Sequence, residues 1–146
     1  MKHFIFSIPA LLIFITVFSC NPKNTNTSQN SVIDDSLSTD TNTIYVYYFH
    51  GSIRCETCVA VDENTHNDLI ELFNNKVENK EIIFQSINID KKGHEDLIKK
   101  YKIWGQTMLF IKGNKSIDKT DDAFMYVTTD PIKWKKIVED TIYELL

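Results

Sequence analysis

Cys55 and Cys58 are the residues whose type and spacing could do chemistry, because they stand three positions apart in Cys55-Glu56-Thr57-Cys58. On a helix, positions i and i+3 lie on the same side of one turn, and two sulfurs placed in this way can form a disulfide. The chain has three cysteines, too few for a scaffold held together by disulfides. The pair therefore points to thiol–disulfide exchange, to metal binding or to a structural disulfide.

The elements on either side of the pair affect its reactivity. The β-branched and aromatic run 44–49 predicts a strand buried on both faces. A helix is predicted to begin near Cys55, where free backbone N–H groups and the positive end of the helix dipole favour a thiolate. Arg54 adds a positive charge beside this sulfur, and Glu56 opposes that effect. His50, at the end of the strand, is a candidate proton acceptor.

This arrangement suits a two-step exchange. The thiolate of Cys55 would attack the disulfide of a partner and form a mixed disulfide. Cys58 lies deeper in the predicted helix and would then resolve that intermediate as a second nucleophile.

The rest of the chain predicts alternating strands and helices. Strands are expected over 44–49, 82–89, 107–111 and 124–127, and helices from near Cys55 to about Val77, from about 93 to 101, and after Asp130-Pro131. The polar stretch 62–68 is expected to weaken and kink the first of these helices. The order is β-α-β-α-β-β-α, an α/β fold with a mixed sheet and helices on both faces.

Residues 44–146 resemble the thioredoxin superfamily, without that family's first strand and helix. The segments that carry the resemblance, besides the C-x-x-C pair, are Asn88-Ile89-Asp90 followed by Leu97, Tyr101-Lys102-Ile103-Trp104-Gly105, and Leu109-Phe110-Ile111-Lys112-Gly113-Asn114. The resemblance implies a thioredoxin-like fold, an exposed nucleophile at Cys55 and a resolving thiol at Cys58. Its partners would be protein disulfides or dithiols, or a membrane redox carrier, with no bound cofactor and no metal.

The sequence departs from this family in three places. The family has a cis-proline whose backbone holds the substrate peptide, whereas this chain has Gln106-Thr107 there, so Trp104, Gln106 and Thr107 form the candidate substrate-binding loop. We expect a trans bond before Thr107, since a cis bond would cost about 2.5–4 kcal/mol. The tryptophan usual before the first cysteine is replaced by Arg54, and the first strand offers tyrosines where the family has a buried acid.

The N-terminal residues are predicted to be a targeting signal and not part of the folded domain. Residues 1–19 contain a short apolar run typical of a signal peptide, since a permanent transmembrane helix needs roughly 20 apolar residues. Val17-Phe18-Ser19-Cys20 resembles a bacterial lipobox, in which Cys20 becomes the lipidated first residue. Residues 20–43, rich in Asn, Thr and Ser, are expected to be a flexible linker to the domain at 44–146. We therefore expect a lipid-anchored protein on the periplasmic side of the cell envelope.

Composition and motif spacing limit the other functions. The net charge of −4, without a basic cluster, argues against nucleic acid as a partner. Val59 after the second cysteine excludes covalent haem attachment, and no second C-x-x-C pair completes a zinc site. A soft-metal site made from Cys55, Cys58 and His50, for Cu or Zn, remains the alternative to redox chemistry.

Overall fold

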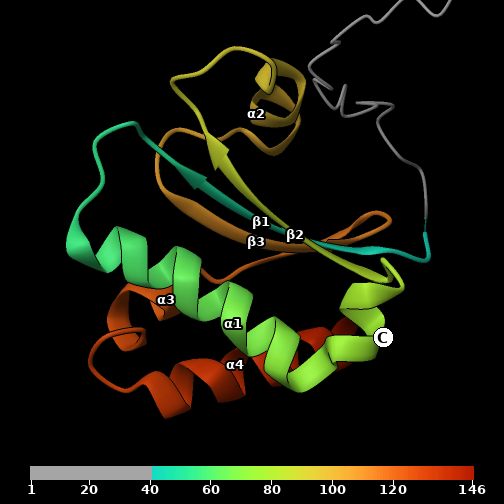
Figure 1. Ribbon diagram of the computed structural model, residues 1–146. Helices are drawn as coiled ribbons and strands as arrows, with labels where there is room; N and C mark the ends of the chain where they lie inside the picture. The colour runs from blue at the N-terminus through green and yellow to red at the C-terminus, as the bar shows by residue number, and fades with distance from the viewer. Residues whose placement is uncertain (1–40) are drawn as a thin grey trace, which may run out of the picture. The chain divides into compact units, whose positions relative to one another are not determined.

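The computed structural model describes residues 41–146, which contain four strands and four helices (Figure 1). In chain order these are β1 (Ile44–His50), α1 (Glu56–Glu78), β2 (Ile82–Asn88), α2 (Glu95–Tyr101), β3 (Thr107–Lys112), β4 (Lys115–Asp118), α3 (Thr120–Tyr126) and α4 (Pro131–Leu145). The predicted signal peptide, the predicted lipidation site Cys20 and positions 20–40 of the predicted linker lie outside the described residues.

The four strands form one mixed sheet in the order β2-β1-β3-β4. β1 runs parallel to β2, with Ile44 opposite Ile82, and antiparallel to β3, with Phe49 opposite Thr107. β4 pairs antiparallel with β3 at the edge. Two parallel strands need a crossover connection, and α1 provides it. The end of β1 and the beginning of β3 therefore meet at the same end of the sheet, where the loops that follow and precede them lie.

β1 is buried on both faces, as its sequence predicts. Successive side chains of a strand point to opposite faces of the sheet. Val46 and Tyr48 belong to the core that includes residues of α1 and α4. Tyr47 and Phe49 lie on the other face and pack with Leu97 of α2. The unbroken run of large side chains in β1 is thus explained by two apolar cores, one on each side of a central strand.

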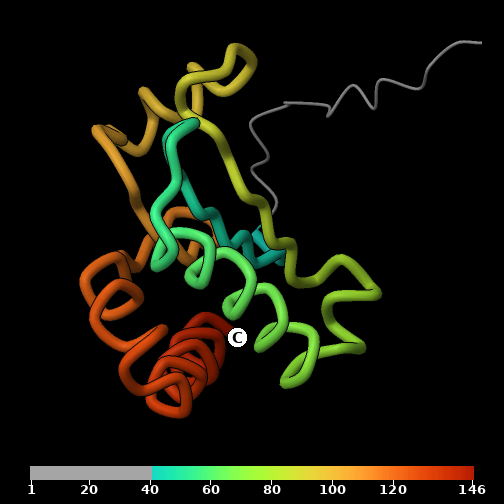
Figure 2. Tube along the Cα trace, turned by 60° about the vertical axis from the view of Figure 1, so that its left-hand side comes forward, coloured from blue at the N-terminus to red at the C-terminus, as the bar shows by residue number. Residues whose placement is uncertain are grey.

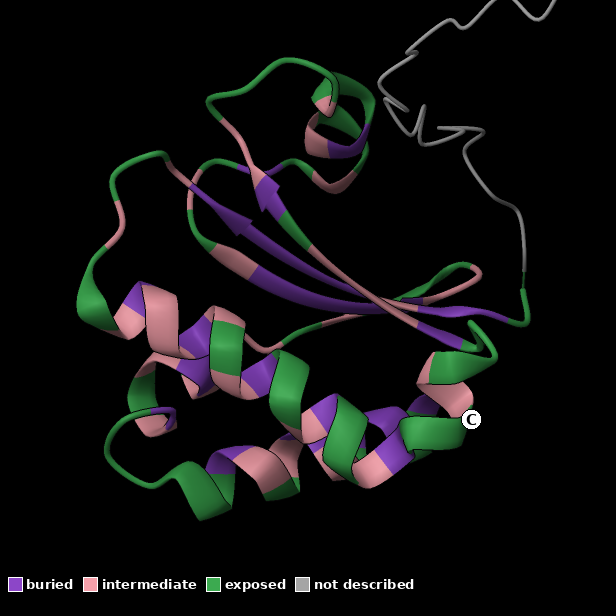
Figure 3. Cartoon of the chain, viewed as in Figure 1, coloured by how far each residue is buried: buried purple, intermediate pink, exposed green. Residues whose placement is uncertain are grey.

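Helices cover both faces of this sheet. α1, α3 and α4 lie together on one face, and the short α2 lies on the other (Figures 1 and 2). Buried surface is concentrated on the central strands and on the helix sides that face them (Figure 3). The largest fully buried side chains include Trp134, Tyr48, Phe49, Phe110, Leu69 and Ile142. This confirms the predicted α/β class, with a mixed sheet between helical layers.

The predicted position of the fourth strand is wrong. Residues 124–127 were expected to form it, but they belong to α3 and to its C-terminal cap, and the fourth strand is β4. β4 carries a single half-buried apolar residue, Ile117, so its sequence gives almost no strand signal. A tight turn through Gly113, whose φ is +55°, places it beside β3. In α3, Ala123 and Val127 are both fully buried, and their spacing of four is helical.

The predicted kink within 62–68 is also wrong, because α1 is regular through this stretch. The departure from helical geometry inside α1 lies later, at Phe73, with φ −135° and ψ 33°. Val61, Thr65 and Leu69 are buried at a spacing of four, and the Thr65 hydroxyl donates to the Val61 carbonyl at 2.6 Å. These residues form one apolar stripe, and the buried hydroxyl of Thr65 has its hydrogen-bond partner within the helix. The stripe therefore packs this stretch of α1 against the core without a kink.

Of the helices within 41–146, none is long and apolar enough to cross a membrane.

α4 begins where the sequence predicts, directly after Asp130. Asp130 is the N-cap, and its carboxylate accepts a hydrogen bond from the backbone N–H of Lys133 at 3.1 Å. Pro131 occupies the first helical position, where its missing N–H costs nothing. Local chemistry alone therefore sets where this helix begins.

Two of the three isoleucines of α4, Ile132 and Ile142, provide a matched test of the packing. Ile142 is fully buried and Ile132 is 83% exposed, so the same substitution removes core contacts at one position only. Ile142→Ala is expected to lower the free energy of unfolding by about 2–5 kcal/mol. Ile132→Ala is expected to change it by no more than about 0.5 kcal/mol. Denaturant unfolding curves measure both values, and equal losses would contradict the way α4 faces the sheet.

Candidate active site

The two cysteines of the C-x-x-C pair form a disulfide at the start of α1, with their Cα atoms 5.0 Å apart. Cys55 is the N-cap residue and is exposed, whereas Cys58 is in the first turn of the helix and is fully buried. The backbone N–H of Cys58 donates to Cys55 Sγ at 3.2 Å. A reagent from solution can therefore reach the sulfur of Cys55 while that of Cys58 is covered by protein.

Helix geometry favours negative charge at Cys55. The first N–H groups of a helix have no carbonyl partner within it, and the helix dipole places its positive end there. The bond from the Cys58 N–H uses one of these free donors on the sulfur of Cys55. Glu56 is exposed in the same first turn, so its opposing charge is screened by water.

The loop between β1 and α1 is attached to the end of β2. The backbone N–H of Ser52 donates to the Asp90 carboxylate at 2.6 Å, and the N–H of Ile89 donates to the His50 carbonyl at 2.9 Å. The Ser52 hydrogen bonds hold the pKa of Asp90 below its ordinary value. These contacts position the start of α1 relative to the sheet.

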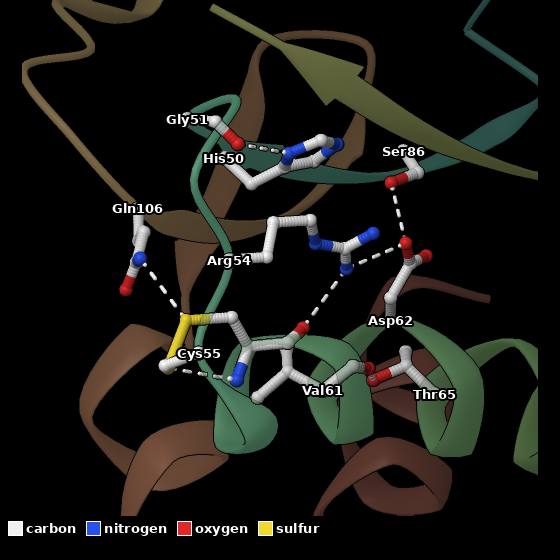
Figure 4. Close-up of polar contacts among 10 residues, drawn as sticks. His50, Gly51, Arg54, Cys55, Val61, Asp62, Thr65, Ser86 and Gln106 are labelled. Carbon is white, nitrogen blue, oxygen red and sulfur yellow. Dashed lines mark hydrogen bonds and ion pairs between the residues drawn. A yellow bond between two sulfur atoms is a disulfide. The ribbon is translucent and has the colours of Figure 1, made fainter.

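Arg54 is directed toward α1 and not toward the sulfurs (Figure 4). Its Nη2 donates to the Cys58 carbonyl at 2.9 Å and lies 2.8 Å from the Asp62 carboxylate. The Ser86 hydroxyl of β2 donates to the same carboxylate at 2.7 Å. Arg54 thus ties the active-site loop to the first two turns of α1, and Asp62 balances its charge.

Tyr48 of β1 is a fully buried tyrosine on the side of the sheet that faces α1. Burial raises the pKa of Tyr48 above its ordinary value of 10, although the nearby Arg54 opposes this rise. The Arg54 guanidinium carbon lies 5.7 Å from the centre of the Tyr48 ring. A phenol that keeps its proton at neutral pH cannot accept one as a carboxylate does.

His50 is buried and makes its contacts at the end of β1. Its Nδ1 lies 2.8 Å from the Gly51 carbonyl, so this nitrogen is the donor of the pair. Its ring lies 5.7 Å from that of Tyr48. In the view of Figure 4, Arg54 lies between His50 and Cys55.

The segment before β3 brings an amide to the pair. Gln106 Nε2 donates to Cys58 Sγ at 3.1 Å (Figure 4). Thr107 begins β3, and its hydroxyl donates to the Gly105 carbonyl at 3.2 Å. The described part of the chain contains no cis peptide bond, so the bond before Thr107 is trans. The polypeptide at this point therefore presents a side-chain donor to the buried sulfur.

Two large apolar side chains stand exposed on the loops at this end of the sheet. Trp104, before β3, and Ile53, before Cys55, are each 94% exposed. Sequence reasoning selected Trp104 and missed Ile53. The available signal was an isoleucine in a polar loop, outside any strand or helix period, two positions before the cysteine. Asp62 was also missed, although it lies one helical turn after Cys58.

A metal centre has little support from this arrangement. Within 41–146, no group of three or more His, Cys, Asp and Glu side chains is placed to hold a metal ion. The two sulfurs are bonded to each other, and His50 donates from Nδ1 to the Gly51 carbonyl.

Comparison with protein-family models found no match, and comparison with curated proteins found none. Among solved structures, one described as a malarial protein is 20% identical over 65% of this chain and 96% of its own, with a TM-score of 0.44. Thioredoxin-2, described as a component of the malaria parasite protein secretion machinery, is 22% identical over 54% of this chain and 70% of its own, with a TM-score of 0.40. Oxidised thioredoxin O2 from Arabidopsis thaliana is 21% identical over 69% of this chain and 76% of its own, with a TM-score of 0.44.

The topology itself assigns the fold. The parallel pair β1 and β2, joined by the crossover helix α1, is followed by α2, by the antiparallel pair β3 and β4, and by the two helices α3 and α4, one more helix than the sequence predicts. The central strand β1 leads into the helix that carries the cysteines. The strand order β2-β1-β3-β4, with the C-x-x-C disulfide at the first turn of α1, gives this domain the thioredoxin-like fold that the sequence predicts.

Proposed function

We propose that this chain is a thiol–disulfide oxidoreductase that exchanges electrons with protein disulfides through Cys55 and Cys58. One observation carries the proposal: the two sulfurs are bonded at the start of a helix, with Cys55 exposed and Cys58 buried beneath it. An attacking group must then meet Cys55 first, and the second sulfur stays within reach to close or open the bond.

The exchange balances without any cofactor. In the reduced chain, the Cys55 thiolate attacks one sulfur of a partner's disulfide, and the other partner sulfur leaves with the electron pair. The Cys58 thiolate then attacks Cys55 Sγ, which forms the bond between the two cysteines and releases the partner's second thiolate. The partner gains two electrons and the chain loses two; the reverse sequence returns them.

The exposed side chains beside Cys55 suit a polypeptide partner. Ile53 and Trp104 present apolar surface on the loops that carry Cys55 and Gln106, and a tryptophan contributes a large contact area when a partner covers it. A small thiol would gain little from such a surface. We therefore propose that the physiological partner is a protein disulfide or dithiol, or else a redox carrier of the membrane.

A disulfide-reduction assay tests the catalytic role of Cys55. The reduced full chain is expected to accelerate the reduction of insulin disulfides by dithiothreitol, because a thiolate at a helix start is a better nucleophile at neutral pH than a free thiol. Cys55→Ser should return the rate to that of dithiothreitol alone.

Cys20→Ser is the matched control, since it makes the same chemical change at the third cysteine. It is expected to retain the wild-type rate. If the Cys55→Ser protein reduces insulin as fast as the control, catalysis through Cys55 is wrong.

We further propose that the domain is tethered to the periplasmic side of the cell envelope by a lipid on Cys20. The support is the sequence pattern: an apolar run, then Val17-Phe18-Ser19-Cys20, then the polar stretch up to the first strand. A tether of this kind would hold the exposed sulfur near membrane-bound partners and raise their effective concentration.

Removal of Cys20 tests the anchor. In a bacterium with two membranes, the wild-type chain is expected in the membrane fraction, and Cys20→Ala is expected in the soluble fraction because it has no acceptor for lipid. Cys55→Ala, which removes a different cysteine, should remain with the membrane. Membrane association of Cys20→Ala equal to that of the wild type would contradict the anchor.

A further inference from the structure

The two sulfurs of the disulfide have different hydrogen-bond donors. Cys55 Sγ accepts from the backbone N–H of Cys58 at 3.2 Å, and Cys58 Sγ accepts from Gln106 Nε2 at 3.1 Å. The second donor comes from 48 positions further along the chain, in the segment that leads into β3. Figure 4 shows the Gln106 side chain reaching toward the disulfide from the side opposite Arg54.

Cys58 needs such a donor more than Cys55 does. It is fully buried, and a buried thiolate loses the solvation that water gives to an exposed one. When the disulfide opens by attack on Cys55, the negative charge forms on this buried sulfur. Without a hydrogen bond, the loss of water around the buried sulfur would disfavour that charge and slow the opening.

The charged groups around Cys58 are engaged elsewhere. Arg54, from the loop, donates to the carbonyl of Cys58 and is paired with Asp62 of α1, so its charge is largely balanced. Tyr48, from β1, is a phenol with an ordinary pKa of 10 that burial raises further, so it carries no charge at neutral pH. Among the described residues, the hydrogen-bond donor to the sulfur of Cys58 is the side chain of Gln106.

We propose that Gln106 stabilises Cys58 Sγ as the leaving sulfur when the disulfide is opened. The proposal rests on the proposed exchange reaction and names a further residue that acts in it. A thiolate of the electron-donating partner attacks Cys55 Sγ and forms a mixed disulfide there. The bond between the cysteines breaks, its electron pair passes to Cys58 Sγ, and the Gln106 N–H donates to the thiolate that results. By microscopic reversibility, the same bond holds Cys58 while it awaits its attack on the mixed disulfide.

The rate of opening by dithiothreitol tests this role in the full chain, with Cys20→Ser in every protein so that the only disulfide sulfurs are those of the pair. Gln106→Leu keeps nearly the same size but has no N–H. It is expected to slow the opening roughly three- to tenfold, because hydrogen bonds to charged groups are among the stronger ones and a poorer leaving thiolate departs more slowly. Gln85→Leu, the same change on β2, is the control and should open at the parent rate.

A titration measures the same hydrogen bond without any turnover. With Cys55→Ser added, Cys58 is the remaining thiol, and its thiolate is followed by ultraviolet absorbance against pH. Gln106→Leu should move the midpoint to higher pH by about one unit, since the donor that favours the charged form is gone. Gln106→Glu should move it in the same direction, because an ionised carboxylate repels the thiolate, and it keeps the size and polarity of the site. Gln85→Leu should leave it unchanged.

An unchanged midpoint in Gln106→Leu, or an opening rate equal to that of Gln85→Leu, overturns the proposal. A shift in both quantities supports it, and a purely structural role of the glutamine would not move the titration in both Leu and Glu variants. The outcome is independent of the insulin assay. Failure of Cys55-dependent insulin reduction would remove the proposed function, whereas failure here would remove only the role of Gln106.

Discussion

The structure depends on where α1 begins. Cys55 caps the helix with its own sulfur, and Cys58 follows at the same side of the first turn. If the helix began at another residue, Cys55 would lose the N-cap position in which its sulfur accepts the Cys58 N–H. The hydrogen bond of Ser52 to Asp90 joins the loop before α1 to the end of β2, and the ion pair of Arg54 with Asp62 joins the same loop to α1 itself. Both contacts stabilise the position at which α1 begins.

Different parts of the site serve the two sulfurs. The exposed sulfur of Cys55 lies at the positive end of a helix and is supplied with a backbone donor, which suits a nucleophile that meets its partner in solution. The buried sulfur of Cys58 depends on a side chain from another loop. Arg54, which the sequence places next to the nucleophile, instead holds the loop to the helix. The positive charge of Arg54 is balanced by Asp62. The charge state of the two sulfurs is therefore governed by the helix start and by the hydrogen bonds that the sulfurs accept.

The central strand brings these parts together. β1 lies between β2 and β3, parallel to one and antiparallel to the other, so its end meets the start of β3. The loop that carries Cys55 and the segment that carries Gln106 therefore leave the sheet at one end. Two apolar cores, one on each face of β1, make this strand difficult to displace. A site assembled from two distant loops can keep hydrogen bonds of about 3 Å only on such a support.

By itself, the sequence determined the features that rest on local signals. These are the buried central strand, the cysteine pair at the start of a helix, and the beginning of α4 at Asp130 and Pro131. It misplaced the fourth strand, because β4 is short, polar and held by pairing with β3, and pairing with a distant strand leaves no local pattern. Only the tertiary structure decided that Gln106 reaches Cys58, since the two residues are 48 positions apart and a strand register brings them together.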